Sequence, residues 1–109
     1  MKKISFLSAA EDEMIQSALF YETQTNGLGT DFLTAVDFAI QSIHDNPELW
    51  PVIRNQVRRR LLKRFPFGIL YRISQHEITV IAVMNLHRDP DYWFSRMMIK
   101  EKQGNYKQS

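Results

Sequence analysis

The sequence predicts an α+β domain in which a pair of helices precedes a mainly antiparallel sheet. Apolar residues recur at helical spacing up to residue 45, whereas strand-like apolar runs dominate between residues 57 and 86. Because the helices come as a pair and do not alternate with strands, the pattern favours α+β over α/β. The expected order is β-α-α-β-β-β, with an antiparallel helical hairpin packed on the sheet and a short C-terminal helix.

A short strand and a helix are expected at the start of the chain. Residues 3–7 alternate well enough for a strand. Ser8 is expected to cap the following helix, and Glu11, three residues later, would complete a capping box. The helix should end in the segment 26–29, because Asn and Gly tolerate the left-handed conformation that terminates helices.

A second helix is expected to follow directly, because its apolar residues fall on one face. These residues are Phe32, Val36, Ala39, Ile40 and Ile43. Pro47 disfavours the helical region for Asn46, so the helix should stop there. The short link between the two helices implies that they run antiparallel to each other.

Three strands are expected in the second half, at residues 57–64, 68–74 and 77–86. The last of them is apolar on both faces, which is typical of a central strand. One or two helical turns are expected over residues 91–99. Five aromatic residues are expected in the core between the hairpin and the sheet, namely Tyr21, Phe32, Phe65, Phe67 and Tyr71.

Length and composition predict one domain over residues 1–99, followed by a polar and mobile tail over residues 100–109. The chain has no cysteine, which excludes disulfides and fits a reducing compartment, so we expect a cytoplasmic protein. No apolar run approaches the length of a membrane span, and no export signal forms at the start. His44, His76 and His87 lack metal-ligand spacing, and we expect neither a metal nor another cofactor.

Charge is divided unevenly along the chain. Residues 1–50 hold two Lys and eight acidic residues, a balance of −6, whereas residues 51–109 hold twelve Lys or Arg and four acids, a balance of +8. A basic working face on the second half would suit an anionic macromolecule or an acidic protein segment. The alternative is that each half is merely solvated by its own charges.

The candidate binding residues are basic or aromatic side chains of the second half. They are Arg58, Arg59, Arg60, Lys63, Arg64, Arg72, Arg88, Trp93 and Arg96. Strand alternation places Arg58, Arg60 and Arg64 on the opposite face from Arg59 and Lys63. These side chains could hold phosphates or carboxylates, and the alternative is an edge strand protected by charge against aggregation.

Three residues after the last strand carry groups that could act as a base, hold an anion or donate a proton. His87 is the group nearby with a near-neutral reference pKa, Arg88 could hold the phosphate, and Tyr92 lies close to both in the sequence. The alternative is that His87 and Arg88 only orient the turn at Asp89 and Pro90 through hydrogen bonds and ion pairs.

The order of elements and several short motifs resemble the RelE/ParE superfamily of bacterial type II toxins, the plasmid stabilisation proteins. The matching pieces are Tyr21-Glu22, Gly27-Leu28-Gly29 with Phe32, Asn46-Pro47 with Trp50-Pro51, the stretch Arg59 to Arg72 around Arg64-Phe65-Pro66-Phe67, and His87-Arg88-Asp89-Pro90 with Trp93 and Arg96. The resemblance implies a cytoplasmic toxin that arrests growth. It also implies a cognate antitoxin that neutralises the toxin in a hetero-oligomer, through an acidic segment.

Two activities are known in that superfamily. RelE-like members are endoribonucleases that cut mRNA on the ribosome, and ParE-like members inhibit DNA gyrase by protein–protein contact without a hydrolytic centre. If this chain is a RelE-like ribonuclease, the resemblance implies that its catalytic candidates for RNA cleavage are His87, Arg88 and Tyr92. Where a RelE-like enzyme carries an arginine near the start of the second hairpin strand, this chain has Gly68, and the C-terminal tyrosine has no clear counterpart. The resemblance therefore favours a ParE-like gyrase inhibitor over the alternative of a RelE-like ribonuclease, although Arg88 matches the arginine after the last strand.

Overall fold

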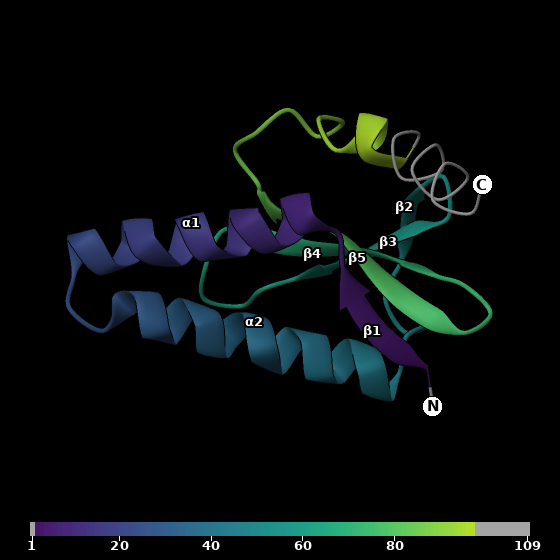
Figure 1. The fold of residues 1–109 in the computed structure, drawn as a ribbon, viewed down its shortest axis with the longest axis horizontal. Coiled ribbons are helices and arrows are strands. Elements are labelled where there is room, and N and C mark those ends of the chain that lie inside the picture. Colours follow the sequence, from purple (N-terminus) through teal and green to yellow (C-terminus); the bar gives the residue numbers. More distant parts are fainter. Residues whose placement is uncertain (1, 98–109) are drawn as a thin grey trace.

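A helical hairpin packs on a five-stranded sheet in the computed structural model, which describes residues 2–97 (Figure 1). The elements are β1 (Lys3–Phe6), α1 (Ser8–Gln24), α2 (Leu28–Asp45), β2 (Val52–Arg54), β3 (Val57–Leu61), β4 (Phe67–Ile73) and β5 (Glu77–Asn85). The predicted α+β class and the helical hairpin are confirmed. Within the described residues, no helix is both long and apolar enough to cross a membrane.

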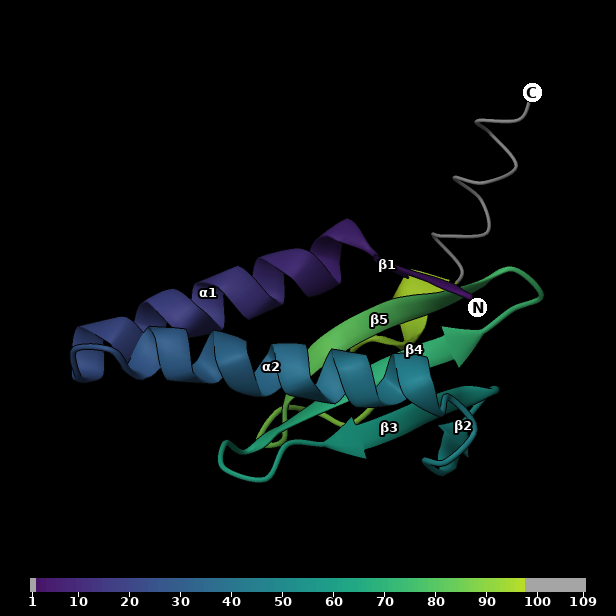
Figure 2. The same cartoon turned by 90° about the horizontal axis from the view of Figure 1, so that it is seen from below.

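The strand order is β1-β5-β4-β3-β2, so the last strand of the chain lies inside the sheet. β5 pairs in parallel with β1 on one side and antiparallel with β4 on the other, and β3 and β2 continue the antiparallel part (Figure 2). The prediction that β5 is a central strand covered on both faces is confirmed, because residues 80–84 are all buried.

The sequence prediction missed β2 and made the following strand too long. β2 has three exposed residues, and it joins β3 through Asn55 and Gln56, whose φ angles are 49° and 66°. Two residues in the left-handed conformation match the twist of a tight hairpin. Such turns normally contain glycine, and this one does not, so the sequence did not predict it. β3 ends at Leu61, so residues 62–64 belong to the connection to β4 and not to a strand.

The expected capping box of α1 is wrong. Leu7 occupies the N-cap position, without a side-chain hydrogen bond, and its carbonyl accepts from the backbone N–H groups of Ala10 and Glu11. The Ser8 hydroxyl therefore does not cap the helix, because Ser8 already lies within the first turn. Continuation of β1 into α1 places the apolar Leu7 at this position, where it packs against both cores.

A carboxylate on α1 instead caps the start of α2. Glu22 accepts hydrogen bonds from the backbone N–H groups of Gly27 and Gly29, both at 2.9 Å. The hydrogen bond from Gly27, reinforced by that from Gly29, lowers the pKa of Glu22. Gly27 has a φ of 86°, and a side chain at Gly29 would collide with the Ala18 carbonyl oxygen, so both glycines are needed for this close turn.

The main core lies between the hairpin and the sheet. Four aromatic rings pack together there with centroid distances of 4.8 to 6.1 Å, namely those of Tyr21, Phe32, Phe65 and Phe67. Tyr71 is also buried, and its hydroxyl donates to the Pro47 carbonyl at 2.5 Å. All five aromatic residues predicted for this core belong to it.

A second, smaller core covers the opposite face of the sheet. The chain folds back over this face after β5 and forms a helical turn at residues 94–97, within the predicted range 91–99. Trp93 and Met97 pack there on Val57, Leu70 and Ile81. The rest of the predicted helix, at residues 98–99, and the predicted tail over residues 100–109 lie outside the described residues.

Candidate functional site

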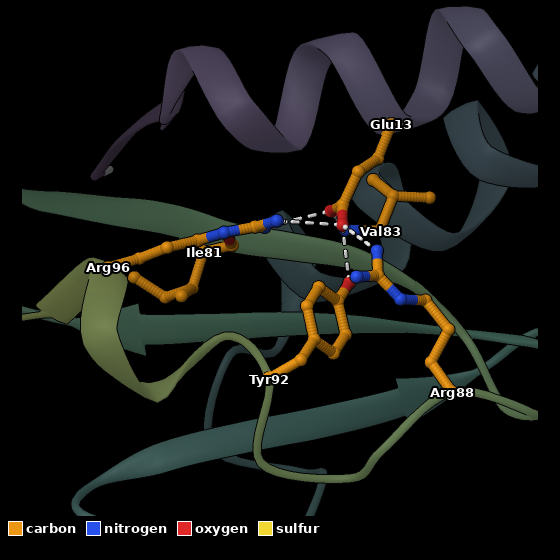
Figure 3. Close-up of polar contacts among 6 residues, drawn as sticks. All are labelled: Glu13, Ile81, Val83, Arg88, Tyr92 and Arg96. Carbon is orange, nitrogen blue, oxygen red and sulfur yellow. Dashed lines mark hydrogen bonds and ion pairs between the residues drawn. The ribbon is translucent and has the colours of Figure 1, made fainter.

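Glu13 of α1 occupies a gap beside the central strand. β1 pairs with β5 only as far as Val80, so beyond that point no strand within residues 2–97 lies next to this edge of β5. The carboxylate of Glu13 accepts a hydrogen bond of 3.0 Å from the Val83 backbone N–H at this open edge (Figure 3). A side chain from α1 therefore satisfies a backbone group that another strand would otherwise satisfy.

Three side chains of the segment after β5 converge on the same carboxylate. Arg96 donates to both oxygens of Glu13, at 2.9 and 2.8 Å, and the Tyr92 hydroxyl donates at 2.5 Å. Arg88 lies 3.4 Å from one oxygen, and its guanidinium stacks 3.7 Å from the centre of the Tyr92 ring. Figure 3 shows Arg88, Tyr92 and Arg96 pointing toward Glu13 from separate positions on this segment. We call these four residues the Glu13 cluster.

The Glu13 cluster is only partly open to solvent, which strengthens its electrostatic interactions. The side chains of Glu13 and Arg96 are 14% and 18% exposed, whereas that of Arg88 is 52% exposed. Burial, followed by the hydrogen bond to Glu13, raises the pKa of Tyr92. The hydrogen bond to Glu13 also raises the pKa of Arg96. Both shifts keep the proton on its group, so Tyr92 and Arg96 remain hydrogen-bond donors to Glu13 at neutral pH.

Two of the three catalytic candidates belong to this cluster. The Tyr92 hydroxyl already donates a hydrogen bond to Glu13, and its raised pKa makes it a weak acid at neutral pH. Arg88 shares the same carboxylate. His87 lies in the exposed turn next to Arg88, and its ring makes no hydrogen bond or ion pair within residues 2–97. The structure thus places His87 and Arg88 in neighbouring positions, but it directs Arg88 and Tyr92 to an internal partner.

Two arginines of β3 point toward the helical hairpin. Arg58 donates to the carbonyl oxygens of Glu48 and Trp50, at 3.0 and 2.6 Å. Arg60 is only 8% exposed and donates to the Ser42 hydroxyl at 2.7 Å, besides the neighbouring backbone. Arg58 therefore binds the loop that follows α2, and Arg60 binds the last turn of α2.

Arg59 and Arg72 lie on the opposite face of the sheet, as strand alternation predicts for Arg59. Arg59 is paired with Leu70, and Arg72 with Val57, so the two arginines are diagonal neighbours on adjacent strands. Neither forms an ion pair or a side-chain hydrogen bond within residues 2–97. We call Arg59 and Arg72 the open-face pair.

The side chain of Arg59 also lies against Gly68. A Cβ atom at Gly68 would come within 3.2 Å of the Arg59 Cγ atom. The place of the arginine expected in a RelE-like enzyme is thus bordered by the aliphatic part of Arg59.

The remaining candidates lie apart from these groups. Lys63 and Arg64 are exposed in the connection between β3 and β4, where Arg64 pairs with Asp31 at 3.3 Å. Trp93 is 1% exposed, and its indole N–H donates to the Pro90 carbonyl at 2.7 Å, so its ring belongs to the second core. No group of His, Asp or Glu side chains suited to a metal ion occurs within residues 2–97.

Comparison with known proteins gives a likeness in structure only. No protein-family model matches the sequence, and no curated protein matches it. A chain of the solved structure described as "Chromosomal ParDE TA system from P. aeruginosa" superposes with a TM-score of 0.60 at 17% sequence identity. The match covers 80% of this chain and 98% of that one. The chain therefore has the fold of a component of a ParDE toxin–antitoxin system, in agreement with the resemblance in its motifs to RelE/ParE toxins.

Proposed function

We propose that this protein is the toxin of a bacterial type II toxin–antitoxin system and that a cognate antitoxin neutralises it. The fold shared with the ParDE structure supports this proposal, as do the RelE/ParE-like motifs. The antitoxin contributes an acidic segment that covers the open-face pair, Arg59 and Arg72. Both guanidinium groups lack a counter-ion within residues 2–97, and a carboxylate-rich segment would supply one.

We further propose that the toxin inhibits DNA gyrase by protein–protein contact. The observation that carries this choice is the Glu13 cluster, because it engages Arg88 and Tyr92, two of the three groups that a ribonuclease mechanism would need. Gly68 supplies no cationic side chain at the position where a RelE-like enzyme has an arginine. Inhibition by contact requires neither a general base nor a general acid.

Two assays with purified protein test the target. Addition of the toxin should inhibit gyrase supercoiling and trap cleaved DNA, and addition of the antitoxin should reverse the effect. Ribosomes programmed with mRNA should show no new 3′ ends under the same conditions. Unaffected supercoiling together with mRNA cleavage that Arg88→Ala abolishes would overturn the gyrase proposal in favour of the RelE-like ribonuclease. Unaffected supercoiling at micromolar protein without mRNA cleavage would also overturn it.

A further inference from the structure

An apolar groove runs along the surface between α1 and α2. Two depressions form it, of about 250 and 310 Å³. The lining of the first includes Ile15, Leu19, Glu22 and Leu33, and that of the second includes Leu33 and Asp37. Leu33 lines both, so the depressions adjoin each other along the helical hairpin. The two helices lie side by side over this length in both views (Figures 1 and 2).

Three large apolar side chains on this groove are exposed to solvent. Ile15 is 44% exposed, Leu19 is 56% exposed and Leu33 is 40% exposed. Ile15 and Leu19 are one turn apart on α1, and Leu33 faces them from α2. Single exposed apolar residues are common on protein surfaces, whereas a contiguous apolar strip along a groove is typical of a binding surface.

The helical hairpin has a uniform charge. Residues 8–45 contain seven Asp or Glu and no Lys or Arg. Glu22 and Asp37 lie on the groove itself, and Asp12 is exposed one turn before Ile15 on α1. Glu22 keeps its negative charge while it caps α2, because its hydrogen bonds come from backbone N–H groups. An occupant of the groove therefore meets an apolar floor with acidic side chains on both helices.

Shape and charge together define the occupant. A groove between two antiparallel helices accepts a third helix through anchors spaced at i, i+3, i+4 and i+7. A symmetric dimer formed through this groove would place two acidic hairpins against each other, which electrostatic repulsion opposes. We propose that the groove binds an amphipathic helix of a partner protein, with apolar anchors on one face and Lys or Arg residues on the flanks. This inference is independent of the proposed gyrase inhibition and concerns a different surface from the open-face pair.

Binding of designed peptides to the full-length protein tests the proposal. Three labelled helical peptides of about 18 residues, long enough for a stable helix, would share one leucine face and carry Lys, Gln or Glu on their flanks. Fluorescence anisotropy at two salt concentrations gives their affinities. We expect the Lys-flanked peptide to bind about tenfold more tightly than the Glu-flanked one, with the difference shrinking at high salt.

Matched variants locate the binding surface. Leu33→Asp should lower the affinity for the Lys-flanked peptide about tenfold, because it places a charge in the middle of the apolar groove. Thr34→Asp, one residue along the same helix and also exposed, should leave apolar docking intact. Circular dichroism confirms that both variants fold. Equal binding of the three peptides, or an equal effect of the two substitutions, would overturn the proposal. So would a wild-type dimer that Leu33→Asp dissociates and that the peptide does not displace.

Discussion

Arg96 donates hydrogen bonds to both carboxylate oxygens of Glu13, although the two residues are 83 positions apart in the chain. The same guanidinium also donates a hydrogen bond to the Ile81 carbonyl at 3.1 Å. This carbonyl lies close to the Val83 N–H, which donates a hydrogen bond to Glu13. The pair thus satisfies one donor and one acceptor of the open edge of β5. It also fastens the segment after β5 to α1, which stabilises the covering of the second core.

Removal of the Glu13 carboxylate should destabilise the protein by about 3 kcal/mol, because Arg96 would remain mostly buried without its partner. Chemical denaturation of Glu13→Ala measures this loss. Glu11→Ala, on the exposed surface of the same helix, is the control and should change stability by less than about 0.5 kcal/mol. Equal stability of the two variants would show that the cluster contributes nothing net.

Substitution of the two glycines in the turn between the helices should reduce stability by different amounts. Gly29→Ala should destabilise the protein by roughly 2 to 3 kcal/mol, because its Cβ atom would collide with the Ala18 carbonyl oxygen and force the helices apart. Gly27→Ala meets no atom within 4 Å and should cost only the strain of a positive φ, about 1 kcal/mol. Thermal unfolding of the two variants checks this order, and the reverse order would contradict the close helix approach.

The free energy of unfolding should fall at alkaline pH, because the buried Tyr71 hydroxyl ionises there. Burial raises the pKa of Tyr71 to about 12, partly opposed by the charge of Arg58. The folded pKa lies above the unfolded value of about 10, so the stabilisation is complete below pH 10 and is lost as the pH rises toward 12. Denaturation at several pH values across this window measures the fall. Tyr71→Phe has no hydroxyl to ionise and should show a smaller decline, and identical slopes would refute the assignment.

Charge reversal on the open-face pair should slow association with the antitoxin. Arg59→Glu and Arg72→Glu should reduce the association rate about tenfold at low salt and flatten its salt dependence, because charges at the rim of an interface act mainly on encounter. Arg60→Glu is unsuitable for this test, because Arg60 is buried and binds Ser42. Stopped-flow kinetics at two ionic strengths provides the measurement, with Lys3→Glu on the far edge strand as the control. An association rate that responds alike to all three reversals would place the antitoxin elsewhere.

Local sequence patterns were sufficient for the elements that depend on neighbouring residues. The apolar face of α2, the alternation of β3 and the apolar run of β5 each predicted an element that the structure contains. The same patterns failed at β2, whose three residues are too few for a period and whose turn lacks glycine. They also failed at Ser8, because a chain that continues from strand into helix left the capping position to Leu7.

Periods of two and 3.6 residues were enough to predict the fold class and the apolar faces of the helices and strands, and a count of residues gave the division of charge. The internal partners of the charged side chains could not be predicted in this way. Glu13 looks like one of three consecutive acids on a helix, yet it alone of them reaches the edge of β5 and collects Arg88, Tyr92 and Arg96. Contacts between residues so far apart follow from the packing of α1 against the sheet, and no local pattern encodes them.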